Sequence, residues 1–397
     1  MYVKCKFNLT HPISQLQAML MYRRTTLNTL PHFLRHTLAL SLVCASSTVL
    51  AVPTYSLVDL GALGNGTSTG MDVNNQGQVT GYSQIGSYQH AFMGDADSGL
   101  TDLGTLGGVH SYGTGLNNQG QFVGYGYTAN NSEVHVFMGD ASSGLIDLGT
   151  LGGRYGYGQD INDAGQVTGY SFNSAGRTRA FIGDMDGLVE LGTLGGVNSY
   201  GMAINDLGQV AGNSYITGNT ATHAFITDAN RALIDLGTLG GSTSWAYGIN
   251  DLGQVAGASS LLNSNDVHAF VGDVNALVDL GTLGGNYSQA NDINNHGQAV
   301  GTSKTASGQF HAFVWDPFLG LQDLNELVGD LTGWQYLHTA SAISNNGYIT
   351  GYGVTSSGKM HAYLLQIDTP NQEVPAPSSL VLTLLGLIGL VARRRKH

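Results

Sequence analysis

Apolar and polar residues alternate in short segments along most of this chain, with no helical period between them. Alternation over four to eight residues, bounded by Gly, Asn, Asp and Ser, is typical of β-strands joined by tight turns. Residues 113–149 contain four such segments: Thr114–Asn117, Gln121–Gly126, His135–Met138 and Leu145–Leu148. The pattern therefore predicts four antiparallel strands, which we call A, B, C and D in chain order.

The four-strand pattern repeats with a nearly fixed period. The segment Asp102–Gly108 (Asp-Leu-Gly-Thr-Leu-Gly-Gly) recurs almost unchanged at Asp147–Gly153, Asp235–Gly241 and Asp279–Gly285. The acidic residues that open the copies stand at 59, 102, 147, 190, 235, 279 and 323, so neighbouring copies are 43 to 45 residues apart. A period of this length with four strands per copy is typical of the blades of a β-propeller.

The order of the segments predicts how the repeats close. The first segment, Ser56–Leu60, is a D strand, and the last, His361–Ile367, is a C strand. Pairing the two would complete the last blade and remove both open sheet edges. We therefore predict an all-β fold, a seven-bladed β-propeller of about 44-residue four-stranded repeats closed by the N-terminal strand. An open β-solenoid or a different blade count is the alternative.

The two ends of the chain differ from the repeat domain, which we assign to residues 52–370. Residues 1–51 are typical of a signal peptide with a long n-region, in which the apolar segment Thr37–Val49 precedes cleavage after Ala51. Residues 371–397 combine a proline-containing segment, the short apolar run Leu380–Ala392 and a basic terminus. The residues of this last region that define its pattern are Val374, Pro375, Ala376, Pro377, Arg393, Arg394 and Arg395.

This C-terminal region resembles the PEP-CTERM sorting signal, with Ala376 where that family has Glu. The repeats resemble the HAF-type extracellular repeats in segments such as Ile161–Val167 and His223–Phe225. The resemblances imply a secreted or outer-surface protein of a Gram-negative cell envelope. They imply signal peptidase and an exosortase as processing partners, with transient membrane insertion through the C-terminal helix.

The composition of residues 52–372, the part expected to be exported, limits which partners they can bind. Residues 52–372 contain six basic and 26 acidic residues, a net charge of −20. Such a surface repels nucleic acid and anionic lipid, which excludes both as expected partners. Both cysteines, Cys5 and Cys44, precede the expected cleavage site, so the exported chain would contain no disulfide, thiolate metal site or cysteine nucleophile.

Aromatic residues are the main ligand-binding candidates. Four of them stand five residues before the strand-A Asn, in the expected D–A crossover, and two more lie in the longer seventh crossover; these are Tyr112, Tyr157, Tyr200, Trp245, Trp334 and Tyr336. Such rings could stack on sugars. The alternative is that they pack between blades as repeated core residues.

Other recurrent polar residues favour structural roles. The strand-A Asn of each repeat, such as Asn162, is followed by Gly in the pattern of a capped hairpin, and no ligand set of a calcium loop follows. The C-strand histidines, such as His223, lie one blade apart, too far to share a metal. We therefore expect no metal and no cofactor, and no familiar catalytic motif is present.

The leading functional hypothesis from the sequence is an exported, non-enzymatic protein that binds exopolysaccharide or another surface component. One alternative is a propeller hydrolase or lyase acting on surface polysaccharide, with its site at the seventh crossover, where Asp330 and His338 stand. Another alternative is a purely structural adhesion scaffold. Arg177, Arg179 and Glu190 are the other positions that depart from the repeat pattern.

The expected processing sites give a first test. Intact mass spectrometry of the protein secreted by its host should give a chain that begins at Val52 and lacks the basic terminus. A secreted form that retains either end would contradict the corresponding sorting assignment.

Overall fold

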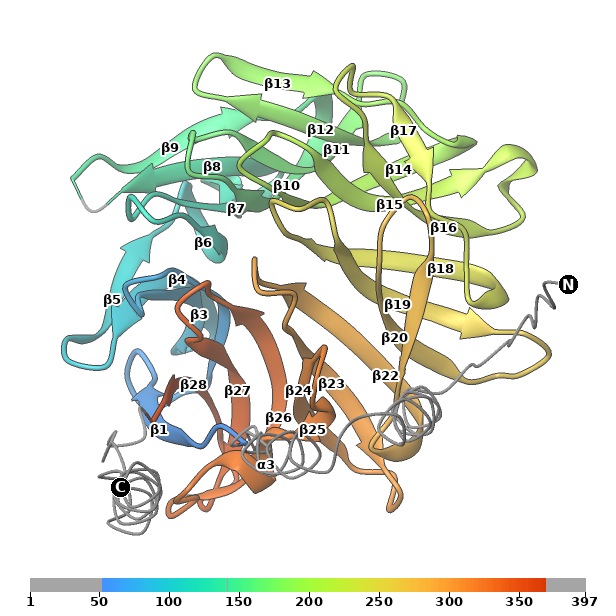
Figure 1. Ribbon diagram of the computed structural model, residues 1–397. Coiled ribbons are helices and arrows are strands. Elements are labelled where there is room, and N and C mark those ends of the chain that lie inside the picture. The colour runs from blue at the N-terminus through green and yellow to red at the C-terminus, as the bar shows by residue number, and fades with distance from the viewer. Residues whose placement is uncertain (1–51, 141, 369–397) are drawn as a thin grey trace, which may run out of the picture. The chain divides into compact units, whose positions relative to one another are not determined.

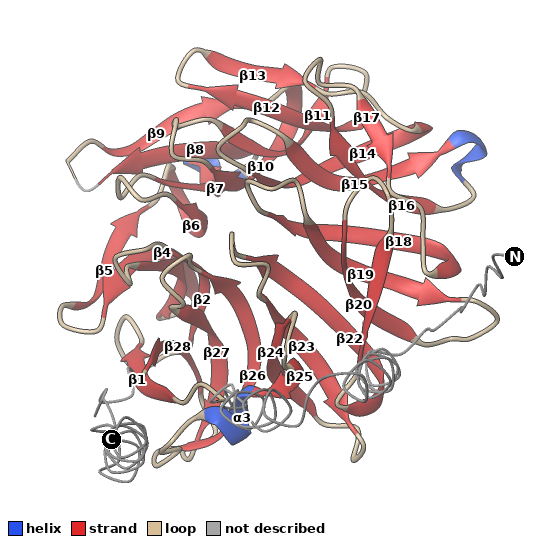
Figure 2. Cartoon of the chain, in the orientation of Figure 1, coloured by secondary structure: helices blue, strands red, loops and turns tan. Residues whose placement is uncertain are grey.

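The strands of this protein form where apolar residues can be buried from both sides. The computed structural model describes residues 52–140 and 142–368, and nearly all regular structure in them is β-strand (Figure 2). Inner strands carry runs of buried residues, as in Val79-Thr80-Gly81 at the start of β3, because neighbouring sheets cover both faces. The outer strands are more exposed; in β5, Thr101 and Asp102 face solvent.

The strands follow one another in sets of four along the chain. Set 1 comprises β2 (Ser68–Val73), β3 (Val79–Ile85), β4 (Tyr88–Asp95) and β5 (Gly99–Gly104). Set 2 comprises β6 (Gly107–Leu116), β7 (Phe122–Thr128), β8 (Val134–Asp140) and β9 (Gly144–Gly149). Set 3 comprises β10 (Gly152–Ile161), β11 (Val167–Asn173), β12 (Thr178–Asp184) and β13 (Gly187–Glu190). Set 4 comprises β14 (Gly195–Ile204), β15 (Val210–Ile216), β16 (Thr222–Thr227) and β17 (Leu233–Asp235).

The C-terminal half continues the same order. Set 5 comprises β18 (Gly240–Ile249), β19 (Val255–Leu261), β20 (Val267–Gly272) and β21 (Leu277–Gly281). Set 6 comprises β22 (Gly284–Ile293), β23 (Ala299–Thr305), β24 (Phe310–Asp316) and β25 (Gly320–Asp323). Set 7 comprises β26 (Trp334–Ile343), β27 (Ile349–Thr355) and β28 (Met360–Ile367), and its fourth strand is β1 (Tyr55–Gly61). The short helical segments are η1 (Ala129–Asn131), η2 (Thr217–Asn219) and α3 (Leu324–Leu327).

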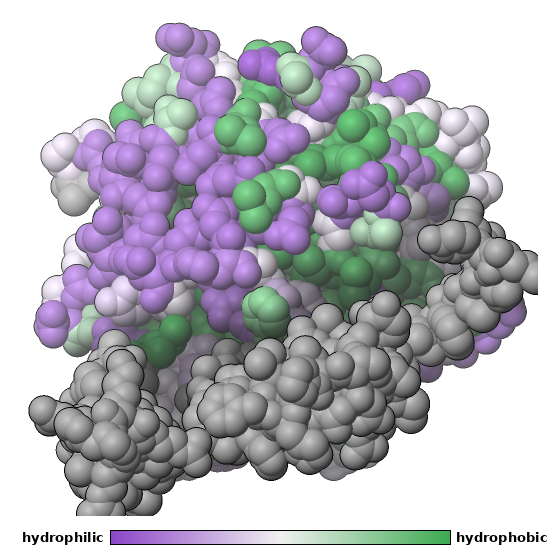
Figure 3. Space-filling model, viewed as in Figure 1, coloured by the Kyte–Doolittle hydropathy of each residue, from purple (hydrophilic) through white to green (hydrophobic). Residues whose placement is uncertain are grey.

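The sets surround a common centre, with the first strand of each set innermost (Figure 1). Sets 2 and 3 join into one eight-stranded sheet through a single parallel residue pair, Tyr155 with Val134, and sets 5 and 6 join in the same way through Tyr287 and Val267. The face seen in Figure 3 is mainly hydrophilic over the centre of the repeat domain. In the residues that the structure describes, no helix is long and apolar enough to span a bilayer.

The fourth strand of set 7 comes from the other end of the chain. Strand β1 pairs antiparallel with β28, so that Tyr55 lies opposite Ile367 and Asp59 opposite Tyr363. The Asp368 amide N–H also donates to the Thr54 carbonyl oxygen at 2.9 Å. The two segments are about 300 residues apart in sequence, and their pairing gives β28 a partner on both edges.

The hydrophobic core is divided into clusters, each between neighbouring sets. One cluster joins Val123 and Val136 of set 2 to Val167 and Phe181 of set 3. Equivalent packing joins the last set to the first, because Leu60, Ala362 and Leu364 of set 7 contact Val73 and Phe92 of set 1.

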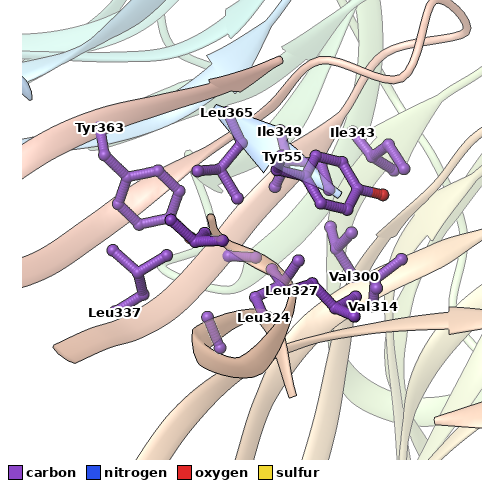
Figure 4. Packing of buried hydrophobic residues seen from close by; sticks show 13 residues of the cluster. Tyr55, Val300, Val314, Leu324, Leu327, Leu337, Ile343, Ile349, Tyr363 and Leu365 are labelled. Atoms are coloured by element: carbon purple, nitrogen blue, oxygen red, sulfur yellow. The ribbon is translucent and has the colours of Figure 1, made fainter. Parts of the chain in front are cut away.

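The cluster between sets 6 and 7 is one of the larger ones (Figure 4). Tyr55 of β1, Tyr363 of β28 and Val314 of β24 are fully buried in it, and Leu324 of α3 packs against them.

A glycine in the second strand of a set leaves room for the aromatic ring of the C strand, as Gly81 does for Phe92. A Cβ at Gly81 would lie 2.0 Å from the Thr69 carbonyl oxygen and 2.9 Å from the Phe92 ring. Any larger residue would therefore separate the first two strands of the set or displace the ring.

Strand A begins earlier than the sequence predicts. We expected Thr114–Asn117, whereas β6 runs from Gly107 to Leu116, and the pair Gly107–Gly108 is part of the strand rather than of a turn. A Cβ at Gly108 would lie 2.4 Å from the Tyr127 carbonyl oxygen, so the close approach of β6 and β7 requires glycine there. These glycines are strand residues at a bulge between Gly107 and Ser111.

The packing of β1 gives a stability prediction. Tyr55 is 1% exposed in the cluster of sets 6 and 7, so Tyr55→Ala should lower the free energy of unfolding by about 3–5 kcal/mol. Tyr88→Ala is the matched control, because Tyr88 is 48% exposed and its loss should cost less than about 0.5 kcal/mol. Urea unfolding followed by fluorescence measures both, and equal losses would contradict the burial of β1.

Candidate active site

The innermost strands line a central pocket of about 550 Å³. In each set, one pocket-lining side chain stands two positions before the last apolar residue of strand A; the seven are Met71, Thr114, Gln159, Met202, Tyr247, Asn291 and Ser341. The flanking Val, Leu or Ile and the following Asn or Ser hardly vary among the repeats. The pocket wall is thus chemically asymmetric although the scaffold around it is repetitive.

Three aspartates stand one position further along their strands and also line this pocket. They are Asp72 at the end of β2, Asp160 at the end of β10 and Asp292 at the end of β22. Each is half-buried, so part of its surface remains on the pocket wall.

Each of these carboxyl groups bridges two neighbouring inner strands. Asp160 Oδ1 accepts a hydrogen bond from the Ile161 amide at 2.7 Å, and Oδ2 accepts one from the Ile204 amide of the next set at 2.7 Å. Asp72 and Asp292 make the equivalent pairs of bonds. A carboxyl oxygen offers two acceptor sites, so one site on each oxygen remains for a proton or a ligand.

Burial changes the protonation of these groups. Removal from bulk water, together with the smaller effect of the nearby Asp292 and Asp206 carboxylates, raises the pKa of Asp160 to about 7, although the two amide donors act to lower it. Burial also raises the pKa of Asp292, to about 6. The pKa of Asp72 is raised well above its usual value, by burial first and then by the other two carboxylates. At neutral pH the pocket therefore holds carboxyl groups in different protonation states.

Aromatic rings form much of the remaining wall. His338 of β26 stacks on Tyr352 with ring centroids 5.1 Å apart and on Phe310 at 5.6 Å, and its Nδ1 lies 2.8 Å from the Thr339 hydroxyl. Burial, and then the nearby His311, lower the pKa of His338 below its ordinary value, so the imidazole is neutral at pH 7.

A row of hydrogen-bonded polar side chains lines the pocket along β22. The Tyr287 hydroxyl donates to Gln289 Oε1 at 2.7 Å, and Gln289 Nε2 donates to Asn291 Oδ1 at 2.7 Å. Asn291 Nδ2 donates in turn to the Ala340 carbonyl oxygen at 2.8 Å. These side chains, which we call the β22 ladder, are fixed before any ligand binds and end next to Asp292.

The four aromatic residues that we expected in crossover loops lie within the innermost strands, and the pocket lining does not include them. Tyr112, Tyr157, Tyr200 and Trp245 belong to β6, β10, β14 and β18. The three tyrosines interleave with strand-B tyrosines across sets; for example, Tyr125 stacks on Tyr112 at 4.9 Å and meets the edge of Tyr157 at 5.0 Å.

The residues of the seventh crossover separate in the structure. Trp334 packs on buried Tyr363, whereas Tyr336 stacks on His311 at 5.9 Å, beside His338. His338 lines the central pocket. Asp330 does not; it is exposed, and its carboxylate accepts a bond from the Thr332 amide.

Sequence reasoning missed the three pocket aspartates. Their only signal is that Asp precedes the last apolar residue of strand A in three repeats, where the others have Gly or Ala. The small residues follow from close packing: a Cβ at Gly115 would lie 2.8 Å from the Asp160 Cα atom.

The C-strand histidines pair with the D-strand acids instead of forming a common site. His90 Nδ1 lies 2.9 Å from an Asp102 oxygen, and four more pairs repeat this contact within their sets. His361 forms the same pair with Asp59 of β1 at 3.0 Å. In set 3 both partners differ, and Arg179 pairs with Glu190 at 2.9 Å.

The strand-A asparagines cap their hairpins, as expected. Asn74 Oδ1 accepts bonds from the Gln76 and Gln78 amides at 3.1 and 3.0 Å. Within residues 52–140 and 142–368, no three His, Cys, Asp or Glu side chains are grouped to hold a metal ion. The expected cleavage after Ala51 and the sorting residues from Val374 to Arg395 lie outside the described residues.

Comparison with known proteins identifies the fold type. No family model and no curated protein matches the sequence. Among solved structures, the β-propeller domain of the Trilobed protease from Pyrococcus furiosus, described as having an open velcro topology, is 8% identical with a TM-score of 0.54; the match covers 79% of this chain and 98% of that one. Oligogalacturonate lyase from Vibrio parahaemolyticus is 11% identical with a TM-score of 0.54, over 81% of this chain and 98% of that one.

Acylaminoacyl peptidase from Pyrococcus horikoshii is 8% identical with a TM-score of 0.51, over 75% of this chain and 51% of that one. These similarities show an all-β fold of the propeller type, and at such low identity they show the fold alone.

The comparisons contradict the prediction of a non-enzymatic binding protein. The similar solved propellers belong to a protease, a peptidase and a lyase, and they favour the hydrolase or lyase alternative. The repeat motif does not contain the carboxyl groups that line the central pocket. The pocket aspartates occur in only some repeats, so a search for periodic residues overlooks them.

The raised pKa values give a pH-dependence prediction. An Asp titrates near 3.8 in the unfolded chain, whereas Asp292 and Asp160 titrate near 6 and 7 in the folded protein. Between these values the folded protein binds more protons, so the free energy of unfolding should fall as pH rises from about 4 to about 7 and then level off.

Thermal unfolding at pH 5 and pH 8 measures this fall. The fall in the free energy of unfolding should be smaller in the double variant Asp160→Asn/Asp292→Asn, which removes two of the three pocket carboxyl groups with a raised pKa. It should persist in the control Asp330→Asn, because Asp330 is exposed and its pKa is lowered by bonds to Thr332. An unchanged fall in the double variant would contradict the assignment.

Proposed function

We propose that this protein is a glycoside hydrolase that acts on a neutral polysaccharide at its central pocket. The observation that carries the proposal is the group of half-buried carboxyl groups in a pocket walled by aromatic rings. Aromatic faces suit the apolar faces of sugar rings, and glycoside hydrolysis needs two carboxyl groups with different protonation states.

In this proposal Asp160 is the general acid and Asp292 the general base. Near pH 6.5 most Asp160 is protonated and most Asp292 is ionised, because their pKa values are about 7 and about 6. Asp160 donates its proton to the glycosidic oxygen as the bond from that oxygen to the anomeric carbon breaks. Asp292 takes a proton from the water whose oxygen joins the anomeric carbon. Proton exchange with solvent restores both groups.

The charge of the pocket supports a neutral substrate. Three carboxyl groups line it, and the described residues of its lining include no Lys or Arg. A uronic acid polymer would bring further negative charge next to Asp292 with no cation to offset it. Since eliminative cleavage needs such an acidic sugar, hydrolysis of neutral sugars is the better fit.

We also infer that the seven strand sets are the seven blades of one ring, which β1 closes. The β1–β28 pairing and the core cluster between sets 7 and 1 support this. We also propose that the chain is exported and processed at both ends, consistent with its acidic repeat domain; signal peptidase and an exosortase would act outside the described residues.

Activity on a panel of neutral polysaccharides, followed by release of reducing ends, tests the function. Asp160→Asn should lower turnover by about 100-fold or more, as should Asp292→Asn. The pH profile of the wild-type enzyme should be bell-shaped, with limbs near 6 and 7.

Asp330→Asn is the control and should keep wild-type turnover, since Asp330 lies away from the pocket. Activity that survives in both pocket variants would rule out this site. No activity on any polymer would favour a purely structural scaffold.

A further inference from the structure

A ring of six hydrogen bonds, open where set 7 has Ser344 in place of Asn, joins the ends of the innermost strands next to the pocket aspartates. The strand-A Asn side chains each donate to a carbonyl oxygen of the next set, as in Asn74 Nδ2 to the Asn117 carbonyl oxygen at 3.1 Å. The same bond recurs from Asn117, Asn162, Asn205, Asn250 and Asn294 at 3.0–3.2 Å. All six donor asparagines are 3–4% exposed.

A second ring follows one residue later in the chain. There the backbone amide of the residue in sets 1 to 6 donates to the side-chain oxygen of its counterpart in the next set, as in Asp163 to Asp206 at 2.8 Å. The ring continues through Asn75, Asn118, Asp251 and Asn295, and Asn346 of set 7 bonds back to Asn75.

The two rings surround a cavity of about 140 Å³, against about 550 Å³ for the pocket, and Asp292 lines both. Pockets that hold small organic ligands are usually about 300–1,000 Å³ in volume. A sugar chain therefore fits the central pocket but not the smaller cavity between the two rings. Widening that cavity would break bonds that join neighbouring sets.

We propose that the central pocket binds a neutral glycan by its end, so that cleavage is exo-acting and releases one or two sugar units. This inference rests on the proposed function for its catalytic part. The aspartates are the last pocket-lining residues of their strands, next to the smaller cavity, so a chain end that enters along the axis reaches them whereas a chain lying across the pocket mouth does not.

The β22 ladder would hold the terminal sugar. Gln289 is its central member, and its amide is already oriented by Tyr287 and Asn291. A carboxamide presents both a donor and an acceptor, which matches the hydroxyl groups of a neutral sugar. Because the ladder ends beside Asp292, the sugar that it orients lies next to the proposed general base.

Comparing the affinities of a linear and a cyclic form of one glycan distinguishes end-on from lateral binding, because the cyclic form has no chain end. The probes are maltohexaose and α-cyclodextrin, which contain the same six α-1,4-linked glucose units with and without ends; cellohexaose and laminarihexaose serve as linear probes of other linkages. Isothermal titration with the secreted chain should show at least one linear hexasaccharide binding. If maltohexaose binds, α-cyclodextrin should bind at least tenfold more weakly.

Equal affinity for the linear and cyclic probes would overturn end-on binding, and so would the absence of binding by all three linear probes. The Gln289→Ala variant should weaken the binding of the linear probe about tenfold. Gln84→Ala is the matched control, because Gln84 lies in β3 outside the pocket and bonds to the Gly86 carbonyl oxygen. Equal effects of the two substitutions would contradict the role of the ladder.

Product analysis with a linear probe labelled at its reducing end separates this inference from the proposed function. Products of one or two sugar units from either end support exo-cleavage, and products of intermediate length overturn it. End-selective binding without any cleavage would leave the binding mode standing and refute the hydrolase.

Discussion

The pairing of β1 with β28 is the constraint on which the rest of this structure depends. It joins segments about 300 residues apart, covers the free edge of β28 and places Tyr55 in the core between sets 6 and 7. The His361–Asp59 contact and the bond from the Ala362 amide to the Ser68 hydroxyl at 2.8 Å reinforce the same junction. Without this junction, set 7 would have an open edge and the inner strands would not be held around one pocket.

The pocket aspartates show how this constraint affects the chemistry. Each carboxyl group bridges the inner strands of two sets, and burial between the sets raises its pKa. The same groups therefore connect neighbouring sets and keep a proton to a higher pH than an exposed aspartate does. A looser ring would admit water, return the pKa values toward 3.8 and remove the difference between Asp160 and Asp292 on which the proposed acid and base roles depend.

Most of the strand order could be predicted, because alternation of apolar and polar residues and the Asp-Leu-Gly motif report local structure. The start of strand A could not, because Gly107 and Gly108 have the composition of a turn, and only the approach of Tyr127 explains them. Tyr112 and its equivalents have the spacing of a binding surface, yet they are strand residues that pack on strand-B tyrosines.

The site was harder to predict than the fold. His338 stood out because the seventh crossover is longer than the others, but Asp330 of the same segment lies on the surface. Asp72, Asp160 and Asp292 are more than 80 residues apart in sequence, and only the arrangement of the sets brings them to one pocket. In contrast, the joint change to Arg179 and Glu190 within one repeat was a usable signal that these two positions are in contact.

Titration of the side-chain carboxyl carbons of Asp160 and Asp292 by NMR tests the central claim most directly. We expect midpoints near pH 7 for Asp160 and near pH 6 for Asp292, both well above the pKa of an exposed aspartate. Midpoints for both groups near 3.8 would show that the pocket does not control their protonation, and would contradict the proposed chemistry.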